Sequence, residues 1–85
     1  MPFRLTENSF DVDVIYTGNR YTKLWQFTNP ITLDYFVIKT HDKTEDFFIF
    51  EVHEKQDNGM YKLTHDGTTN QLDVAICIMN GWKFD

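Results

Sequence analysis

The sequence predicts an α+β fold, in which an antiparallel sheet of four to five strands forms a meander and one C-terminal helix packs on a face. Three observations support this fold. One segment has clean apolar–polar alternation, several short runs rich in β-branched and aromatic residues follow between turn sequences, and the last segment has apolar residues at helical spacing. A small all-β barrel is the alternative, because the last segment also alternates.

The first two predicted strands form a β-hairpin over residues 10–27. Apolar side chains occupy every second position of residues 10–16, with Asp11 and Asp13 between them. This alternation is typical of a half-buried strand whose carboxylates point to solvent. A Gly-Asn dipeptide then offers the backbone angles of a tight turn, and residues 21–27 return as the second strand.

The third predicted strand covers residues 32–40, which are rich in β-branched and aromatic residues. Asn29 and Pro30 end the strand before it and could begin a short helix, because proline suits a first helical turn. Residues 41–46 are a polar connector.

The fourth predicted strand covers residues 46–53 and contains four consecutive bulky apolar residues at 47–50. Both faces of this strand are therefore apolar. We expect a central strand with one face on the core and the other beneath a covering element. Residues 56–59 are a turn sequence, and residues 60–64 predict a shorter fifth strand.

The C-terminal segment predicts a helix, since apolar residues occur at positions i, i+3, i+4 and i+7. These residues are Leu72, Ala75, Ile76 and Met79. Thr68 or Thr69 would supply the N-cap, and Gly81 would end the helix. The same segment alternates from residue 72 to 78 before an Asn-Gly dipeptide, which would suit a hairpin strand. The helix is favoured because the second apolar face of the fourth strand needs a cover.

The chain predicts a single compact domain over residues 1–85. Its apolar runs are far shorter than the ~20 residues of a membrane-spanning helix, and residues 1–4 do not resemble a signal peptide. With one cysteine no internal disulfide can form, which fits a reducing compartment. We therefore expect a cytoplasmic protein, located in the host cytoplasm if a phage or mobile element encodes it.

The formal net charge is −5, and all of it arises in the second half of the chain. Residues 1–40 hold four basic and four acidic side chains, whereas residues 41–85 hold four basic and nine acidic ones. An acidic surface repels nucleic-acid backbones and anionic membranes. Direct nucleic-acid and membrane binding are therefore disfavoured, and a partner would be basic. A simple solubility charge is the alternative.

No arrangement of residues indicates catalysis, and we expect neither enzymatic activity nor a cofactor. Cys77 lies in an apolar run, where a buried thiol would be inert. Ser9 has no histidine near it in sequence, and the four glycines are isolated, so no phosphate-binding loop is present.

A metal site is a weak alternative. The three histidines, His41, His53 and His65, are spaced twelve residues apart, and each precedes a carboxylate. An antiparallel meander would bring His41 and His65 to one edge of the sheet, with His53 about 20 Å away. A zinc site there would comprise His41, Asp42, His65 and Asp66. Polar residues at strand ends are the ordinary interpretation.

A second alternative is a β domain that binds a small ligand or single-stranded nucleic acid. Tyr21 and Trp25 lie on one strand face with Lys23 between them, like a base-stacking platform. Aromatic packing within the sheet explains the same residues.

The remaining class is recognition of another protein, as a small acidic inhibitor or adaptor. Acidic residues flank the most aromatic strand, and carboxylates around an aromatic anchor can guide and hold a basic partner. The predicted binding residues are Asp42, Glu45 and Asp46 at one end, Glu54 and Asp57 at the other, and Phe48 as the anchor. This size and charge are similar to those of small inhibitor, antitoxin or adaptor proteins, including those of phages and mobile elements. An open sheet also offers edges through which a homodimer could form.

Overall fold

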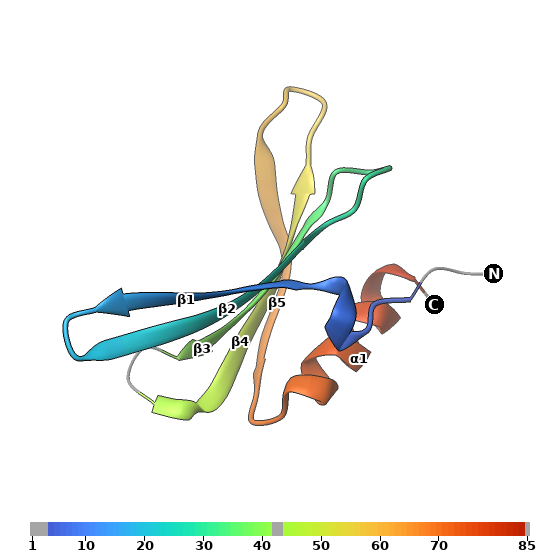
Figure 1. Ribbon diagram of the computed structural model, residues 1–85. Coiled ribbons are helices and arrows are strands. Elements are labelled where there is room, and N and C mark those ends of the chain that lie inside the picture. Colours follow the sequence, from blue (N-terminus) through green and yellow to red (C-terminus); the bar gives the residue numbers. More distant parts are fainter. Residues whose placement is uncertain (1–3, 42–43, 85) are drawn as a thin grey trace.

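The computed structural model describes the backbone of residues 4–41 and 44–84, and all of their side chains except those of His41, Thr44 and Glu45. Its elements are the 3₁₀ turn η1 (Glu7–Ser9), strands β1 (Asp11–Thr17), β2 (Arg20–Thr28), β3 (Tyr35–His41), β4 (Thr44–Lys55) and β5 (Tyr61–Thr69), and helix α1 (Leu72–Lys83). The strands form one antiparallel sheet in the order β1-β2-β3-β4-β5 (Figure 1). The α+β meander is confirmed. The all-β alternative is wrong, because the C-terminal segment is helical.

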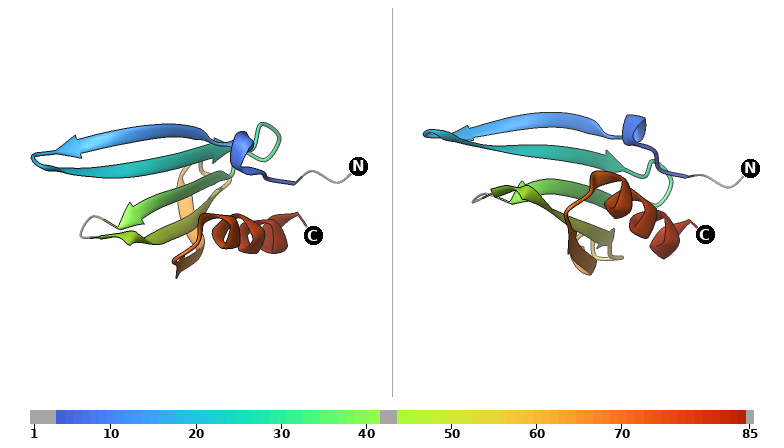
Figure 2. Two further views of the ribbon diagram at one scale, coloured as in Figure 1. Left: turned by 60° about the horizontal axis from the view of Figure 1, so that its bottom comes forward. Right: turned by 90° about the horizontal axis from the view of Figure 1, so that it is seen from below.

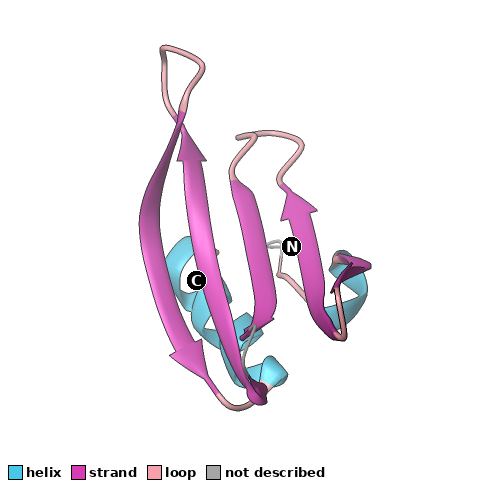
Figure 3. Cartoon of the chain, turned by 90° about the vertical axis from the view of Figure 1, so that its left-hand side faces the viewer, coloured by secondary structure: helices cyan, strands magenta, loops and turns pink. Residues whose placement is uncertain are grey.

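The sheet is strongly twisted, and its first and last hairpins extend in different directions from the middle of the molecule (Figure 1). Helix α1 lies against one side of the sheet, where it contacts β4 and β5 (Figure 2). Figure 3 shows the helix behind the strands. We call the side that carries α1 the helix face. The opposite side, over which no described helix lies, is the open face.

The core lies between the helix face and α1. Alternate residues of the inner strands point to this face, and among them Phe36, Ile38, Phe50 and Val52 are almost completely buried. From the helix, Ala75, Ile76 and Met79 are buried and Leu72 packs beside them. The apolar stripe predicted from helical spacing is therefore confirmed.

The N-terminal segment is tied to the helix by a pair of hydrogen bonds. The side-chain oxygen of Asn80 accepts a hydrogen bond from the Leu5 backbone N–H at 2.7 Å. The Asn80 amide nitrogen donates to the Leu5 carbonyl at 2.9 Å. Both residues are buried, so these bonds satisfy the polar groups of the asparagine within the core.

Strand β1 is present where the alternation predicts it, but its predicted half-burial is wrong. All of its residues are exposed. Val12 and Val14 lie on the helix face, yet they keep 48% and 44% of their surface in solvent. The reason is that the hairpin extends past α1, which contacts β4 and β5 instead. Phe10, just before the strand, is buried.

The C-terminal helix predicted to cover the second face of β4 is present, but it lies over the core face, and no element among the described residues covers the opposite face. Phe47 and Ile49 lie on the open face, and Phe47 remains 50% exposed. Helix α1 covers the other face, above Phe50. The apolar run at 47–50 therefore contributes to two different surfaces.

The segment between β2 and β3 is a loop, neither a short helix nor the start of a strand. The Asn29 side-chain oxygen accepts hydrogen bonds from the N–H groups of Ile31 at 2.9 Å and Thr32 at 3.3 Å. Such a turn replaces the backbone pairing of a strand. Leu33 then adopts a φ of 65°, and β3 begins only at Tyr35.

The last strand is longer than predicted, because it stays paired with β4 well beyond residue 64. Thr68 and Thr69 therefore belong to β5, and the helix N-cap is Gln71. The helix also passes through Gly81 and ends at Lys83, so both predicted helix ends are wrong.

The predicted burial of the single cysteine on α1 is wrong. The thiol of Cys77 is exposed, because this residue lies outside the apolar stripe that faces the sheet.

No helix within residues 4–41 and 44–84 has both the length and the apolar composition needed to span a membrane.

Candidate binding surface on the open face

Strand register places a row of side chains across the open face. In this row each residue pairs with the next, in the order Asp11, Gln26, Val37, Glu51 and Asp66. Paired residues of neighbouring strands point to the same face. The row therefore has carboxylates towards both edges and Val37 at its centre, where this valine is only 6% exposed.

The neighbouring row continues the same arrangement, in the order Asp13, Leu24, Lys39 and Ile49. Asp13 accepts a hydrogen bond from the side chain of Gln26 at 3.4 Å, so it lies beside the first row. Leu24 and Ile49 extend the apolar centre. We call Asp11, Asp13, Glu51 and Asp66 the flanking carboxylates.

An aromatic hollow adjoins this surface. Tyr35, His53 and Tyr61 line a space of about 320 Å³, and the Tyr35 and His53 rings lie 6.0 Å apart. The His53 Nε2 atom is 3.5 Å from a Glu51 carboxylate oxygen. Partial burial raises the pKa of Tyr35, so its phenol stays neutral and donates a hydrogen bond to Gln26.

A second group of charged residues lies at the C-terminal end of α1. Lys83 Nζ is 3.2 Å from a Glu54 carboxylate oxygen and 3.5 Å from one of Asp34. Contacts with the Thr64 hydroxyl and then with Lys83 hold the pKa of Glu54 below its ordinary value. Glu54 therefore stays ionised and engaged within the chain.

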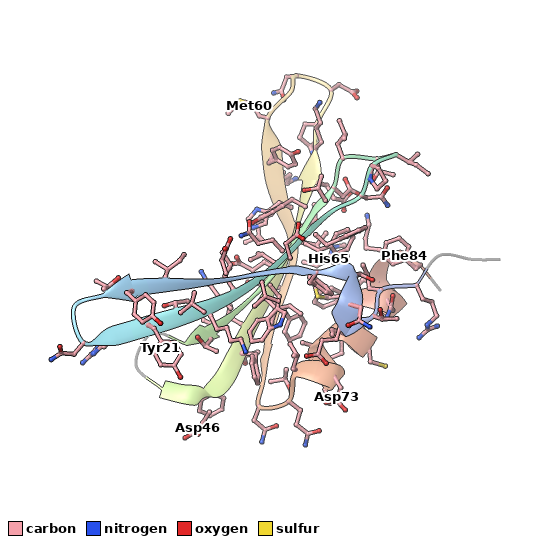
Figure 4. The ribbon with its side chains drawn as sticks, viewed as in Figure 1. Tyr21, Asp46, Met60, His65, Asp73 and Phe84 are labelled. Carbon is pink, nitrogen blue, oxygen red and sulfur yellow. The ribbon has the colours of Figure 1, made fainter. Side chains whose placement is uncertain are left out.

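Among the binding residues predicted from sequence, those that the structure describes lie towards the two ends of β4. Asp42 and the side chain of Glu45 lie outside the described residues. Asp46 lies at the same end of the sheet as Tyr21, whereas Met60, beside the turn that holds Asp57, lies at the other end (Figure 4). Phe48 is half-buried against Trp25, at 5.7 Å between ring centroids. Of these residues, Glu54 is engaged within the chain by Lys83, and the open face is a second acidic surface beside the predicted ones.

Tyr21 and Trp25, the residues predicted to stack on a ligand, do not form an open platform. Trp25 is only 5% exposed, and Lys23 Nζ lies 5.2 Å from the centre of its ring. Tyr21 instead packs against Tyr16, with 6.3 Å between ring centroids.

The predicted metal ligands are also separated where the structure describes them. Asp42 and the side chain of His41 lie outside the described residues. His65 and Asp66 are successive residues of β5 and point to opposite faces. His65 stacks on Trp82 at 4.9 Å between ring centroids. Within the described part of the chain, no group of three or more His, Cys, Asp or Glu residues could hold a metal ion.

The expected separation of His53 and His65 is wrong. Because β5 continues to Thr69, His65 lies inside the strand, opposite Val52 and beside His53. A meander with a short fifth strand would have placed them at opposite edges.

Comparison with known proteins found no match for this chain among protein-family models, curated proteins or solved structures.

Sequence reasoning missed most of this surface. Alternation placed Asp11 and Asp13 in solvent, but the carboxylates of Glu51 and Asp66 were not connected with them. The missing information was the register between strands, which brings residues 11 and 66 into one row.

Proposed function

We propose that this chain is a non-enzymatic protein-binding domain, a small acidic inhibitor or adaptor that engages a basic surface of another protein through its open face. The observation that supports this proposal is the position of the flanking carboxylates. They lie on two sides of an apolar centre, and no described helix covers that centre.

The two kinds of residue have complementary roles in such binding. Carboxylates steer a basic partner towards the surface, and apolar side chains that become desolvated provide most of the binding free energy. Leu24 and Ile49, which are half-buried, surround the buried Val37 and form the part of the apolar centre that a partner can cover, and Phe47 adds an exposed aromatic ring on the same face. A solvated acidic face would need no apolar centre.

The charge of this face supports a protein partner over a nucleic acid. Strand register places the four flanking carboxylates on this face together with three basic side chains, Arg20, Lys39 and Lys55, so the face keeps a small excess of negative charge that would repel phosphates. The proposal also places the chain in the cytoplasm of the cell that contains the partner, where a single cysteine would stay reduced.

The experiment is affinity capture of the tagged chain from a candidate host lysate at low and high salt, read by mass spectrometry. Three baits are compared with wild type. The open-face variant is D13N/D66N, which neutralises two exposed flanking carboxylates and leaves Asp11 in place. The control variant is E7Q/D73N, which removes the same charge from exposed carboxylates outside both candidate sites. The third bait, D42N/E45Q/D46N, tests the acidic end predicted from sequence.

We expect a basic partner in stoichiometric amount that high salt partly releases. The open-face variant should lose it, and the control variant should retain it. Equal retention by these two variants would contradict binding through the open face, and loss with the third bait alone would move the site to the end of the sheet. A partner that is acidic or insensitive to salt would contradict the electrostatic part of the proposal.

A further inference from the structure

Strand β1 forms an unprotected edge of the sheet. All seven of its residues are exposed, and they pair with β2 without a register shift. The other edge strand, β5, shifts register against β4 and is contacted by α1. Irregular pairing and a covering element protect a strand edge from other chains. Of the two edge strands in the described part of the sheet, β1 is therefore the one that can pair with another chain.

The hairpin turn determines which backbone groups of β1 point outward. A two-residue loop joins β1 to β2, and Gly18, its first residue, has the positive φ of 63° that a type II′ turn requires. In such hairpins the residues that flank the loop, here Thr17 and Arg20, exchange backbone hydrogen bonds. Alternate residues back from Thr17 therefore bond to β2, and the residues between them point outward. The outward residues are Val12, Val14 and Tyr16.

We propose that β1 pairs antiparallel with β1 of a second copy of this chain, about a two-fold axis at Val14. Val14 then lies opposite Val14 of the second copy, and Val12 lies opposite Tyr16 of the second copy. The outward backbone groups of both copies meet in this register. Their apolar side chains, which include a Tyr16 that is 75% exposed in one copy, become buried against each other.

The charges of β1 favour this register over its neighbours. Asp11 lies opposite Thr17 of the second copy, and Asp13 lies opposite Ile15 of the second copy. A shift by two residues towards the N-terminus would place Asp13 opposite Asp13, where like charges destabilise pairing. Only the register centred on Val14 avoids placing two carboxylates directly opposite each other and also pairs the full length of the strand.

The proposed register also brings opposite charges together. Within each copy Arg20 pairs with Thr17. Arg20 of the second copy therefore lies in the same row and on the same face as Asp11, one strand further away. Inside one copy the two residues lie at opposite ends of the hairpin, about 20 Å apart at the rise of a β-strand. The Asp11–Arg20 contact can thus form only between copies.

The dimer can be tested without a partner protein, although Asp11 belongs both to the flanking carboxylates and to the proposed contact with Arg20, and the dimer would extend the same surface. A two-fold axis perpendicular to the sheet keeps both helices on one side. The two open faces then join on the other side as one sheet of ten strands, twice the five of one copy.

Sedimentation equilibrium tests the proposal with three variants. Wild type should dimerise, and V14P should abolish dimerisation, because proline removes an outward N–H and is tolerated at strand edges. R20E should weaken the dimer about tenfold, because the introduced carboxylate repels Asp11 of the other copy. The exchanged variant D11R/R20E should restore it. Since these two positions are distant within one copy, rescue identifies a contact between copies.

Cross-linking tests the register and does not depend on proline. In a C77S background, which removes the exposed native thiol, V14C should form a disulfide dimer on oxidation. V12C alone and Y16C alone should not, whereas a mixture of the two should form a heterodisulfide. Circular dichroism of each variant establishes that it is folded.

Two results would overturn the proposal. One is a wild-type chain that remains monomeric at millimolar concentration. The other is a dimer that folded V14P and R20E leave unchanged and that V14C does not cross-link, which would place the contact elsewhere on the molecule.

Discussion

The ring of Phe50 lies directly against the backbone of Gly67 on the neighbouring strand. These residues pair between β4 and β5, and a β-carbon at position 67 would lie only 2.6 Å from the Phe50 Cζ atom. On its other side the ring packs against Trp82, with 5.4 Å between ring centroids. The core ring therefore occupies the space that any other residue at position 67 would fill.

Gly67→Ala should destabilise the fold by about 1–3 kcal/mol, because the methyl group forces Phe50 away from its position between the sheet and α1. Urea unfolding measures the change. Gly81→Ala is the matched control. No atom lies within 4 Å of a β-carbon at this helical position, so alanine should stabilise the helix by up to about 1 kcal/mol. Equal effects of the two substitutions would contradict the contact.

The contacts of Glu54 with the Thr64 hydroxyl and with Lys83 should make stability depend on pH. The pKa of Glu54 is lowered in the folded state, so its contribution is complete above the pKa of the unfolded chain, about 4.3, and is lost as pH falls through the folded value. Glu54→Gln should thus be less stable than wild type near neutral pH and approach it in acid. Thermal unfolding from pH 3 to pH 7 measures this difference.

Asp57→Asn is the control for that series, because Asp57 is an exposed residue of the turn between β4 and β5. Its stability should follow the wild-type curve across the pH range. A Glu54→Gln curve that stays parallel to wild type would show that the contact with Lys83 does not favour the carboxylate.

Leu33→Asn should stabilise the chain by about 0.5–1 kcal/mol, because asparagine tolerates the left-handed backbone region better than leucine does. Leu33 has a φ of 65°, and its side chain is exposed, so little packing is lost. Ile31→Asn, in the same loop without a positive φ, should give no such gain. Unfolding by urea compares the two, and loss of stability in Leu33→Asn would contradict backbone strain at this position.

The thiol of Cys77 should react with a maleimide in the folded chain, because it is exposed on α1. We expect nearly the same alkylation rate with and without denaturant, measured by intact-mass spectrometry. Protection in the folded state, released by urea, would indicate that the residue faces the core after all.

The local sequence predicted most of the elements, although it left a strand as the alternative to the C-terminal helix. Alternation from residue 10 and the Gly-Asn turn predict the first hairpin, and helical spacing of Leu72, Ala75, Ile76 and Met79 predicts the buried face of α1. These signals are strong because they depend on neighbours within a few residues. The ends of β5 and α1 were predicted less well, since Thr68 and Thr69 favour a cap locally but pair with β4 in the folded chain.

By itself, the sequence therefore indicated the successive strands and a meander, favoured a helix over a strand in the C-terminal segment, and predicted the outward position of Asp11 and Asp13. The tertiary structure decided which side of the sheet the helix covers. It also left β1 exposed and brought Asp66 into one row with Asp11. The physical reason is the distance along the chain between the contacts involved. Register across five strands and the bonds between Leu5 and Asn80 join residues far apart in sequence, and no local pattern encodes them.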